Sequence, residues 1–242
     1  MTPQLNEIWV YLSATPLLGL TITLLAYQAA FWLYQRSGMN PLANPVLIAV
    51  TILVALLMLT GTSYQTYFDG AQFVHFLLGP ATVALAIPLY TQLKRVKAML
   101  LPVVVGLLAG SLTAAFSAIA IAKLLGASLP TQLSLAPKSV TTPIAMGIAE
   151  RIGGIPSLTA VLVIATGILG AVGGRYVFNA MRIYDPAIRG FAIGIASHGI
   201  GTARAFQVSE QSGAFAALAM GLNGALTALL LPFLLSATRG LG

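Results

Sequence analysis

The feature that most constrains this chain is a series of apolar stretches long enough to cross a lipid bilayer. Residues 98–125 carry one charged side chain, Lys123, and residues 156–177 carry only Arg175. A transmembrane helix needs roughly 20 mostly apolar residues. Charged residues make up only 7% of the chain, against about 25% in soluble globular proteins. The sequence therefore predicts an all-α, polytopic membrane protein without a soluble domain.

Two shorter segments, residues 137–152 and 190–208, are interrupted by Gly and Pro and lie between the longer stretches. If the basic loops at 94–97 and 182–189 share the cytoplasmic side, each short segment must begin and end on one side, as a re-entrant hairpin does. If each segment instead crosses once, two further spans are added. We therefore predict about 6 to 8 transmembrane helices with two broken or re-entrant segments. The longer stretches are residues 8–34, Pro45–Thr60, 73–93, 98–125, 156–177 and 213–236.

The domain organisation predicted is one integral membrane domain, residues 1–242. Residues 1–72 form N-terminal scaffold spans, and residues 73–242 form a core with broken segments near 79–88, 137–152 and 190–206. Residues 80–83 (PATV) resemble residues 137–140 (PKSV), and each is followed by another proline. Paired Gly/Pro-interrupted segments in two halves of a transporter point to its binding site. Thr82 is included among the candidate binding residues on this basis.

The stretch 136–145, APKSVTTPIA, places a lysine and hydroxyl side chains between two prolines. Non-helical backbone at membrane depth occurs where it lines a cavity or is buried in protein. A broken helix also presents unpaired N–H groups and a positive dipole end that attract anions. Lys138, Ser139, Thr141 and Thr142 are therefore candidate ligands for a carboxylate. The alternative is a surface loop whose lysine reaches the lipid headgroups.

The stretch 196–207, ASHGIGTARAFQ, is the second candidate. Ionisable residues inside a membrane segment are costly and mark functional sites by default. Arg204 could hold a carboxylate with two hydrogen bonds, and His198 could carry a coupling proton. Gly199 and Gly201 permit tight turns, and Thr202 adds a hydroxyl group.

Structural roles compete with this interpretation. Arg204 could pair with Glu150 or Glu210, and His198 could cap a helix. The remaining arginines of the second half are interpreted as topology determinants rather than ligands: Arg175, Arg182 and Arg189.

Several kinds of function have no signal in the sequence. There is no phosphate-binding loop, no HExxH zinc motif and no cysteine, and the two histidines are far apart. Ser197 and His198 are adjacent and would point apart, so they do not form a nucleophile–base pair. The basic residues lie mainly at loop ends, which is typical of membrane topology and not of nucleic-acid binding. We expect no enzymatic activity, no metal, no cofactor and no nucleic-acid partner.

Four stretches carry a resemblance to a known family: PKSVTTPIA (137–145), GGIPSLTAVLVIATGILGA (153–171), SHGIGTARA (197–205) and LLGPATVALAIPLY (77–90). They closely resemble the CidB/LrgB family of bacterial inner-membrane proteins. The family is related to the plastid glycolate/glycerate translocator, in which a small LrgA-like domain precedes the LrgB-like part.

The resemblance implies one of two functions. One is a secondary transporter of small carboxylates of the glycolate, glycerate or pyruvate type, for which we expect an elevator-type mechanism. The other is an antiholin-like regulator of murein hydrolase activity and autolysis. Either implies a multi-pass protein of the bacterial inner (plasma) membrane with a CidA/LrgA-like small membrane protein as partner. Small residues in the spans favour a homodimer or higher oligomer.

Overall fold

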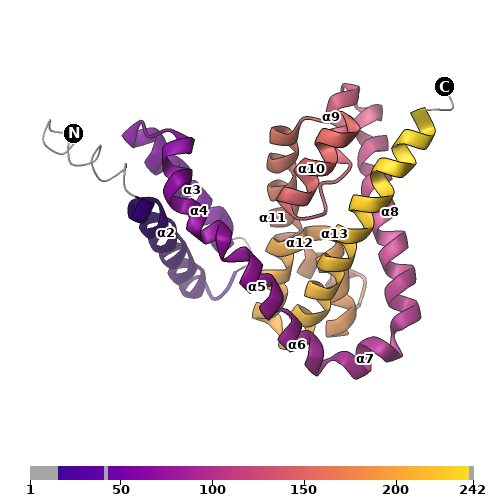
Figure 1. Ribbon diagram of the computed structural model, residues 1–242. Coiled ribbons are helices and arrows are strands. Elements are labelled where there is room, and N and C mark those ends of the chain that lie inside the picture. The colour runs from indigo at the N-terminus through magenta and orange to yellow at the C-terminus, as the bar shows by residue number, and fades with distance from the viewer. Residues whose placement is uncertain (1–15, 41–42, 240–242) are drawn as a thin grey trace, which may run out of the picture. The chain divides into compact units, whose positions relative to one another are not determined.

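The computed structural model describes residues 16–40 and 43–239, and within these ranges every regular element is a helix (Figure 1). The described chain divides into two compact units, with the boundary between Ala84 and Leu85. The division into a scaffold, 1–72, and a core, 73–242, stays a prediction. The predicted broken segment at 79–88 is shared between two short helices, α5 (Leu78–Ala84) and α6 (Ala86–Thr91).

In the first unit, a close contact holds α2 (Pro16–Arg36) against α4 (Tyr64–Phe76). A Cβ atom at Gly19 would lie 2.6 Å from the carbonyl oxygen of Tyr67, and Thr23 Oγ1 lies 2.8 Å from Tyr67 Oη. Asn44 caps the N-terminus of α3, because its Oδ1 accepts hydrogen bonds from the backbone N–H groups of Val46 and Leu47. The helices of this unit before α5 are α2 (Pro16–Arg36), α3 (Pro45–Thr60) and α4 (Tyr64–Phe76).

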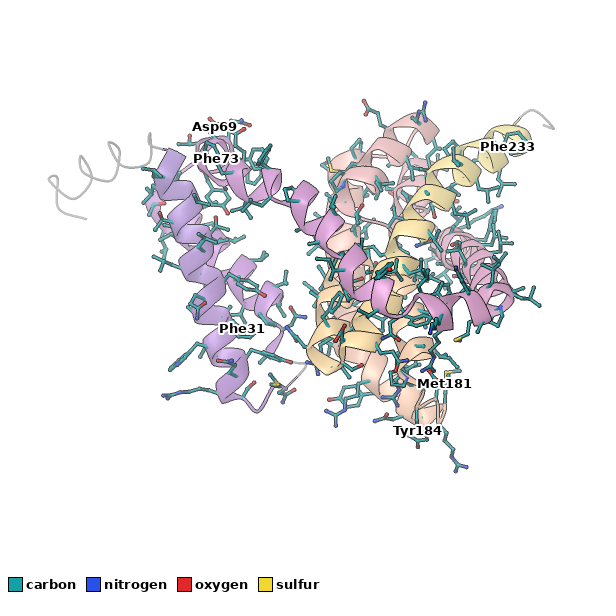
Figure 2. All side chains as sticks on the ribbon, turned by 60° about the horizontal axis from the view of Figure 1, so that its bottom comes forward. Phe31, Asp69, Phe73, Met181, Tyr184 and Phe233 are labelled. Carbon is teal, nitrogen blue, oxygen red and sulfur yellow. The ribbon has the colours of Figure 1, made fainter. Side chains whose placement is uncertain are left out.

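The second unit places its long helices between two ends that carry different loops. In Figure 1, α7 (Leu93–Ala98) lies at the lower end, and α9 (Leu129–Leu135) and α10 (Thr142–Ile152) lie at the upper end. Figure 2 shows Met181 and Tyr184, which follow α11, at the opposite end of this unit from Phe233 of α13. Besides α6, its helices are α7 (Leu93–Ala98), α8 (Leu100–Leu124), α9 (Leu129–Leu135), α10 (Thr142–Ile152), α11 (Pro156–Ala180), α12 (Pro186–Val208) and α13 (Glu210–Arg239).

An ion pair connects a helix and a turn at the lower end of this unit. Arg95 Nη2 donates to Asp185 Oδ2 at 2.6 Å, which joins α7 to the turn between α11 and α12. Thr91 also donates a long hydrogen bond, 3.4 Å, to the carboxylate of Glu210 at the start of α13. The basic segments 94–97, which the structure shows as part of α7, and 182–189 therefore lie at the same end of the unit, as the charge pattern predicted.

Helix α12 is not straight: the chain turns sharply at Ser197 (φ −131°, ψ 16°) and His198 (φ 40°, ψ −134°). Before the turn α12 runs parallel to α13. A Cβ at Gly190 would overlap Ser212, and one at Gly194 would lie 2.8 Å from the Cα of Ala216. Since α13 starts at Glu210, the chain must return between residues 198 and 209. The segment thus doubles back, as a re-entrant hairpin requires.

The segment from 134 to 155 also begins and ends close together. The backbone N–H of Ile155 donates to Ser134 Oγ at 2.7 Å, and Thr159 Oγ1 donates to the Ser134 carbonyl at 3.0 Å. A Cβ at Gly154 would lie 3.0 Å from the Ser134 backbone nitrogen. Between these contacts the chain travels into the unit through the turn after α9 and returns along α10.

Four of the described helices are long and apolar enough to cross a membrane, and the bent pair Tyr64–Val74 and Gly79–Thr91 makes a fifth if it counts as one span. Helix α3 is apolar but shorter. The chain is thus an all-helical membrane protein, and the number of 6 to 8 spans stays a prediction, since part of the 8–34 stretch lies outside the described residues. The four are Leu17–Arg36, Leu100–Leu124, Pro156–Ala180 and Glu210–Leu235.

Candidate functional site

The turn inside α12 is the most strained backbone position near the candidate residues. His198 has φ +40°, a region that a non-glycine residue rarely adopts and that costs about 1–3 kcal/mol. Its side chain is 4% exposed, and its Nε2 lies 3.0 Å from the carbonyl oxygen of Val163 on α11. Thr202 Oγ1 donates to the His198 carbonyl at 2.7 Å. His198 and Thr202 therefore stabilise the turn, and both are buried.

Glycines on the facing helix and in the returning half of α12 make room for this turn. A Cβ at Gly167 would lie 2.8 Å from His198 Nε2, and one at Gly170 would overlap Ser197 Oγ. A Cβ at Gly201 would lie 2.6 Å from Ser197 Cβ, whereas Gly199 has only Met220 Sδ within 4 Å, at 3.9 Å. Gly201 thus acts through packing. Ser197 Oγ is buried without a hydrogen-bond partner in the described structure.

The stretch between α9 and α10 forms the second non-helical segment. The backbone N–H groups of Lys138 and Val140 donate to carbonyls three residues earlier in turns, at 3.1 and 3.2 Å. Lys138 Nζ lies 3.3 Å from Ser139 Oγ. Lys138 is half-buried. Thr141 precedes α10 in an extended conformation without a side-chain cap, and Thr142 begins that helix.

Asn223 of α13 joins the two broken segments. Its side-chain nitrogen donates to the carbonyl of Ile195, at 3.0 Å, and to that of Ser139, at 3.4 Å. Its Oδ1 accepts from Ser111 Oγ of α8 at 2.5 Å and from Thr227 Oγ1 at 3.2 Å. Asn223 is 1% exposed. One amide group thus fixes α8, α13 and both broken segments, and sequence reasoning did not single it out.

Arg204 lies in a different place from the Ser139–Asn223–His198 region. It lines a cavity of about 230 Å³ between α11, α12 and α13 together with Arg175 and Arg189. Its Nη1 donates to Gln207 Oε1 at 3.2 Å. None of the lining residues given by the structure comes from residues 137–142. The two predicted segments meet through Asn223, but Lys138 and Arg204 do not line this cavity together.

The other predicted residues add little to the site. Gly199, Thr141 and Thr142 are half-buried beside the two breaks. The side chain of Thr82 lies outside the described residues. Among the described residues, no three His, Asp or Glu side chains are grouped as metal ligands.

The strain at His198 leads to a prediction. His198→Ala and His198→Gly both remove the ring and its contact with Val163, but only glycine tolerates φ +40° without a Cβ clash. We expect the alanine variant to have a free energy of unfolding lower by about 1 kcal/mol than that of the glycine variant. Chemical unfolding in detergent, followed by far-UV circular dichroism, measures the difference. Ala203 is exposed in the helical part of α12 after the turn, so Ala203→Gly should lower the free energy of unfolding by about 1 kcal/mol. If alanine were more stabilising than glycine at position 198 as well as at position 203, the strained turn would be contradicted.

Comparison with known proteins identifies relatives along most of the chain. The model of the LrgB-like family matches residues 23–237. The uncharacterized protein YwbG of Bacillus subtilis (strain 168) is 40% identical over 220 residues, which are 91% of this chain and 97% of the relative. The uncharacterized protein YxaC of the same strain is 37% identical over 201 residues, 83% of this chain and 87% of the relative.

A third relative has a functional name. The antiholin-like protein LrgB of Bacillus cereus (strain B4264) is 30% identical over 218 residues, which are 90% of this chain and 95% of the relative. No solved structure matches the chain. The family model and the extent of these alignments agree with the motifs at 137–145, 153–171 and 197–205, and we conclude that the chain belongs to the LrgB-like family.

Proposed function

We propose that the chain is a secondary transporter of small carboxylates of the glycolate, glycerate or pyruvate type. The observation that carries the proposal is the meeting of two broken segments at Asn223, whose amide nitrogen donates to the carbonyls of Ser139 and Ile195. Broken segments that approach from two ends and meet inside a membrane protein are typical of transporter binding sites. Irregular backbone at such depth needs a cavity or surrounding protein.

The residues beside Asn223 suit a carboxylate better than a cation or a neutral solute. Lys138 supplies a positive charge next to Ser139 Oγ. Thr141 and Thr142 lie at the start of α10, where free backbone N–H groups and the helix dipole favour an anion. His198 stabilises the second break, and its role in proton coupling is part of the proposal. Lys138 would hold the substrate in competition with water.

The rest of the proposed arrangement comes from the sequence and from the family resemblance. It comprises the bacterial inner membrane, a CidA/LrgA-like small membrane protein as companion, a homodimer or higher oligomer, and no enzymatic activity. The core helices would move relative to the N-terminal spans in an elevator-type cycle. The count of 6 to 8 spans belongs to the same proposal.

Uptake of radiolabelled glycolate, glycerate and pyruvate into proteoliposomes tests transport directly. The full chain would be reconstituted with its companion subunit. Lys138→Met should lower the uptake rate at subsaturating substrate about tenfold or more, because a charge-assisted hydrogen bond contributes roughly 1.5–3 kcal/mol. Lys123→Met is the matched control, since Lys123 is an exposed lysine in the last turn of α8. Absence of saturable flux with folded protein would overturn the proposal.

A second function, antiholin-like regulation of murein hydrolases, is favoured by the name of the relative from Bacillus cereus. That name supports regulation more directly than it supports transport. Regulation through oligomerisation predicts that Lys138→Met leaves the lysis phenotype unchanged. Substitutions on the exposed apolar surface of α13, at Leu229 and Phe233, should then abolish it. The transport proposal instead predicts that Lys138→Met lowers carboxylate uptake and that substitutions at Leu229 and Phe233 leave uptake intact.

A further inference from the structure

We propose that the cavity lined by Arg175, Arg189 and Arg204, the three-arginine pocket, binds a phosphate group. The pocket has a volume of about 230 Å³, several times the roughly 30 Å³ that one water molecule occupies in the liquid. Its arginines come from α11 and from both halves of α12, which the turn at Ser197–His198 brings together. The inference is independent of carboxylate transport.

The charged side chains among the described residues that line the pocket are all arginines. No Asp or Glu is among the nine described lining residues. Asp185, a carboxylate at the same end of the unit, pairs with Arg95 of α7. Like charges grouped at a partly apolar wall repel one another, and a bound anion removes that cost.

Arg189 is held in place for such an anion. Its Nε donates to the Ile183 carbonyl and its Nη2 to Asn179 Oδ1, both at 2.6 Å. Its guanidinium group also lies over the rings of Phe178 and Tyr184, at 5.7 and 5.6 Å from their centroids. These neutral partners fix the plane of the guanidinium group without cancelling its charge. Less side-chain entropy is then lost when the group binds a ligand.

The chemistry favours phosphate over a small carboxylate. Planar guanidinium groups bind phosphate oxygens in pairs, and three of them match a group with three or four oxygens better than one with two. The pocket also lies at the end of the unit that carries the basic loops 94–97 and 182–189, which the positive-inside rule places toward the cytoplasm. Basic pockets between membrane helices on that side bind the headgroups of anionic lipids. A lipid headgroup and a free phosphate share this chemistry.

Binding can be measured on the full chain in dodecyl maltoside, which has no phosphate. Inorganic phosphate and short-chain phosphatidylglycerol would be titrated separately at constant ionic strength, with binding read by calorimetry and by the shift in melting temperature. Arg175→Gln should weaken binding about tenfold or more, and Arg175 is exposed, so this change should leave folding intact. Arg182→Gln is the matched control, because Arg182 is exposed near the same end but does not line the pocket.

Each outcome decides the question. Binding of phosphatidylglycerol alone assigns the pocket to a lipid headgroup, and binding of inorganic phosphate assigns it to a soluble phosphate compound. Arg204→Gln should reproduce the loss seen with Arg175→Gln. The proposal is overturned if neither probe binds the wild-type protein, or if Arg182→Gln weakens binding as much as Arg175→Gln does. Because the readout is binding and not uptake, its failure is separate from a failure of the transport proposal.

Discussion

Asn223→Leu is expected to lower the free energy of unfolding by about 2–4 kcal/mol and to abolish carboxylate uptake. Leucine matches the size of asparagine but leaves the carbonyls of Ser139 and Ile195 without their shared donor. Each buried polar group left unpaired costs about 1–3 kcal/mol in proteins, and hydrogen bonds between membrane helices measure toward the lower end. Chemical unfolding in detergent, followed by far-UV circular dichroism, and uptake into proteoliposomes measure the two effects.

Thr227→Val is the control for that experiment. Thr227 lies one helical turn after Asn223 and donates only one hydrogen bond, at 3.2 Å, to the same Oδ1. Its replacement keeps both contacts from the amide nitrogen to the broken segments, so uptake should persist and the stability loss should be about 1 kcal/mol or less. Retention of uptake by folded Asn223→Leu would show that the two segments do not need this amide to form the substrate site.

Composition was sufficient to predict most of the candidate membrane spans. The predicted stretches 98–125, 156–177 and 213–236 overlap the candidate spans Leu100–Leu124, Pro156–Ala180 and Glu210–Leu235. The reason is physical, because about 20 apolar residues specify a membrane span without help from tertiary contacts. Gly and Pro likewise marked the two places where the chain departs from a single straight helix.

The convergence of these places at one side chain could not be predicted from spacing. Asn223 is 84 positions from Ser139 and 28 from Ile195, and no local pattern relates the three. The available signal was a lone amide inside an otherwise apolar span, which is costly unless it has partners.

The position of Arg204 also needed the structure. Arg204 and Lys138 were both predicted as ligands for a carboxylate, whereas Arg175 and Arg189 were interpreted as topology determinants. The turn at His198 sends the second half of α12 back toward the end where it began, so that Arg204 lines a cavity with those two arginines. A sequence read as one linear helix does not bring residues 189 and 204 together, because a straight α-helix separates them by roughly 22 Å.

Gly194→Ala is expected to destabilise the second unit by about 1–3 kcal/mol. The added Cβ would overlap the carbonyl of Ala216 and lie 2.8 Å from the Cβ of Ala219, and a backbone atom cannot move aside as a flexible side chain can. Helix propensity acts in the opposite direction, since alanine is favoured over glycine by about 1 kcal/mol. A net loss therefore requires the close approach of α12 to α13. Chemical unfolding in detergent measures the sign.

The same methyl group placed elsewhere should have the opposite effect. Gly221 is an exposed residue within α13 and has nothing within 4 Å of an added Cβ, so Gly221→Ala should raise the free energy of unfolding by up to about 1 kcal/mol. Displacement of α12 in Gly194→Ala also moves Ile195, one residue later, away from Asn223. Carboxylate uptake should therefore fall in Gly194→Ala and persist in Gly221→Ala. Equal stability of the two variants would mean that α12 and α13 are not packed backbone to backbone, and the parallel start of the hairpin would then be wrong.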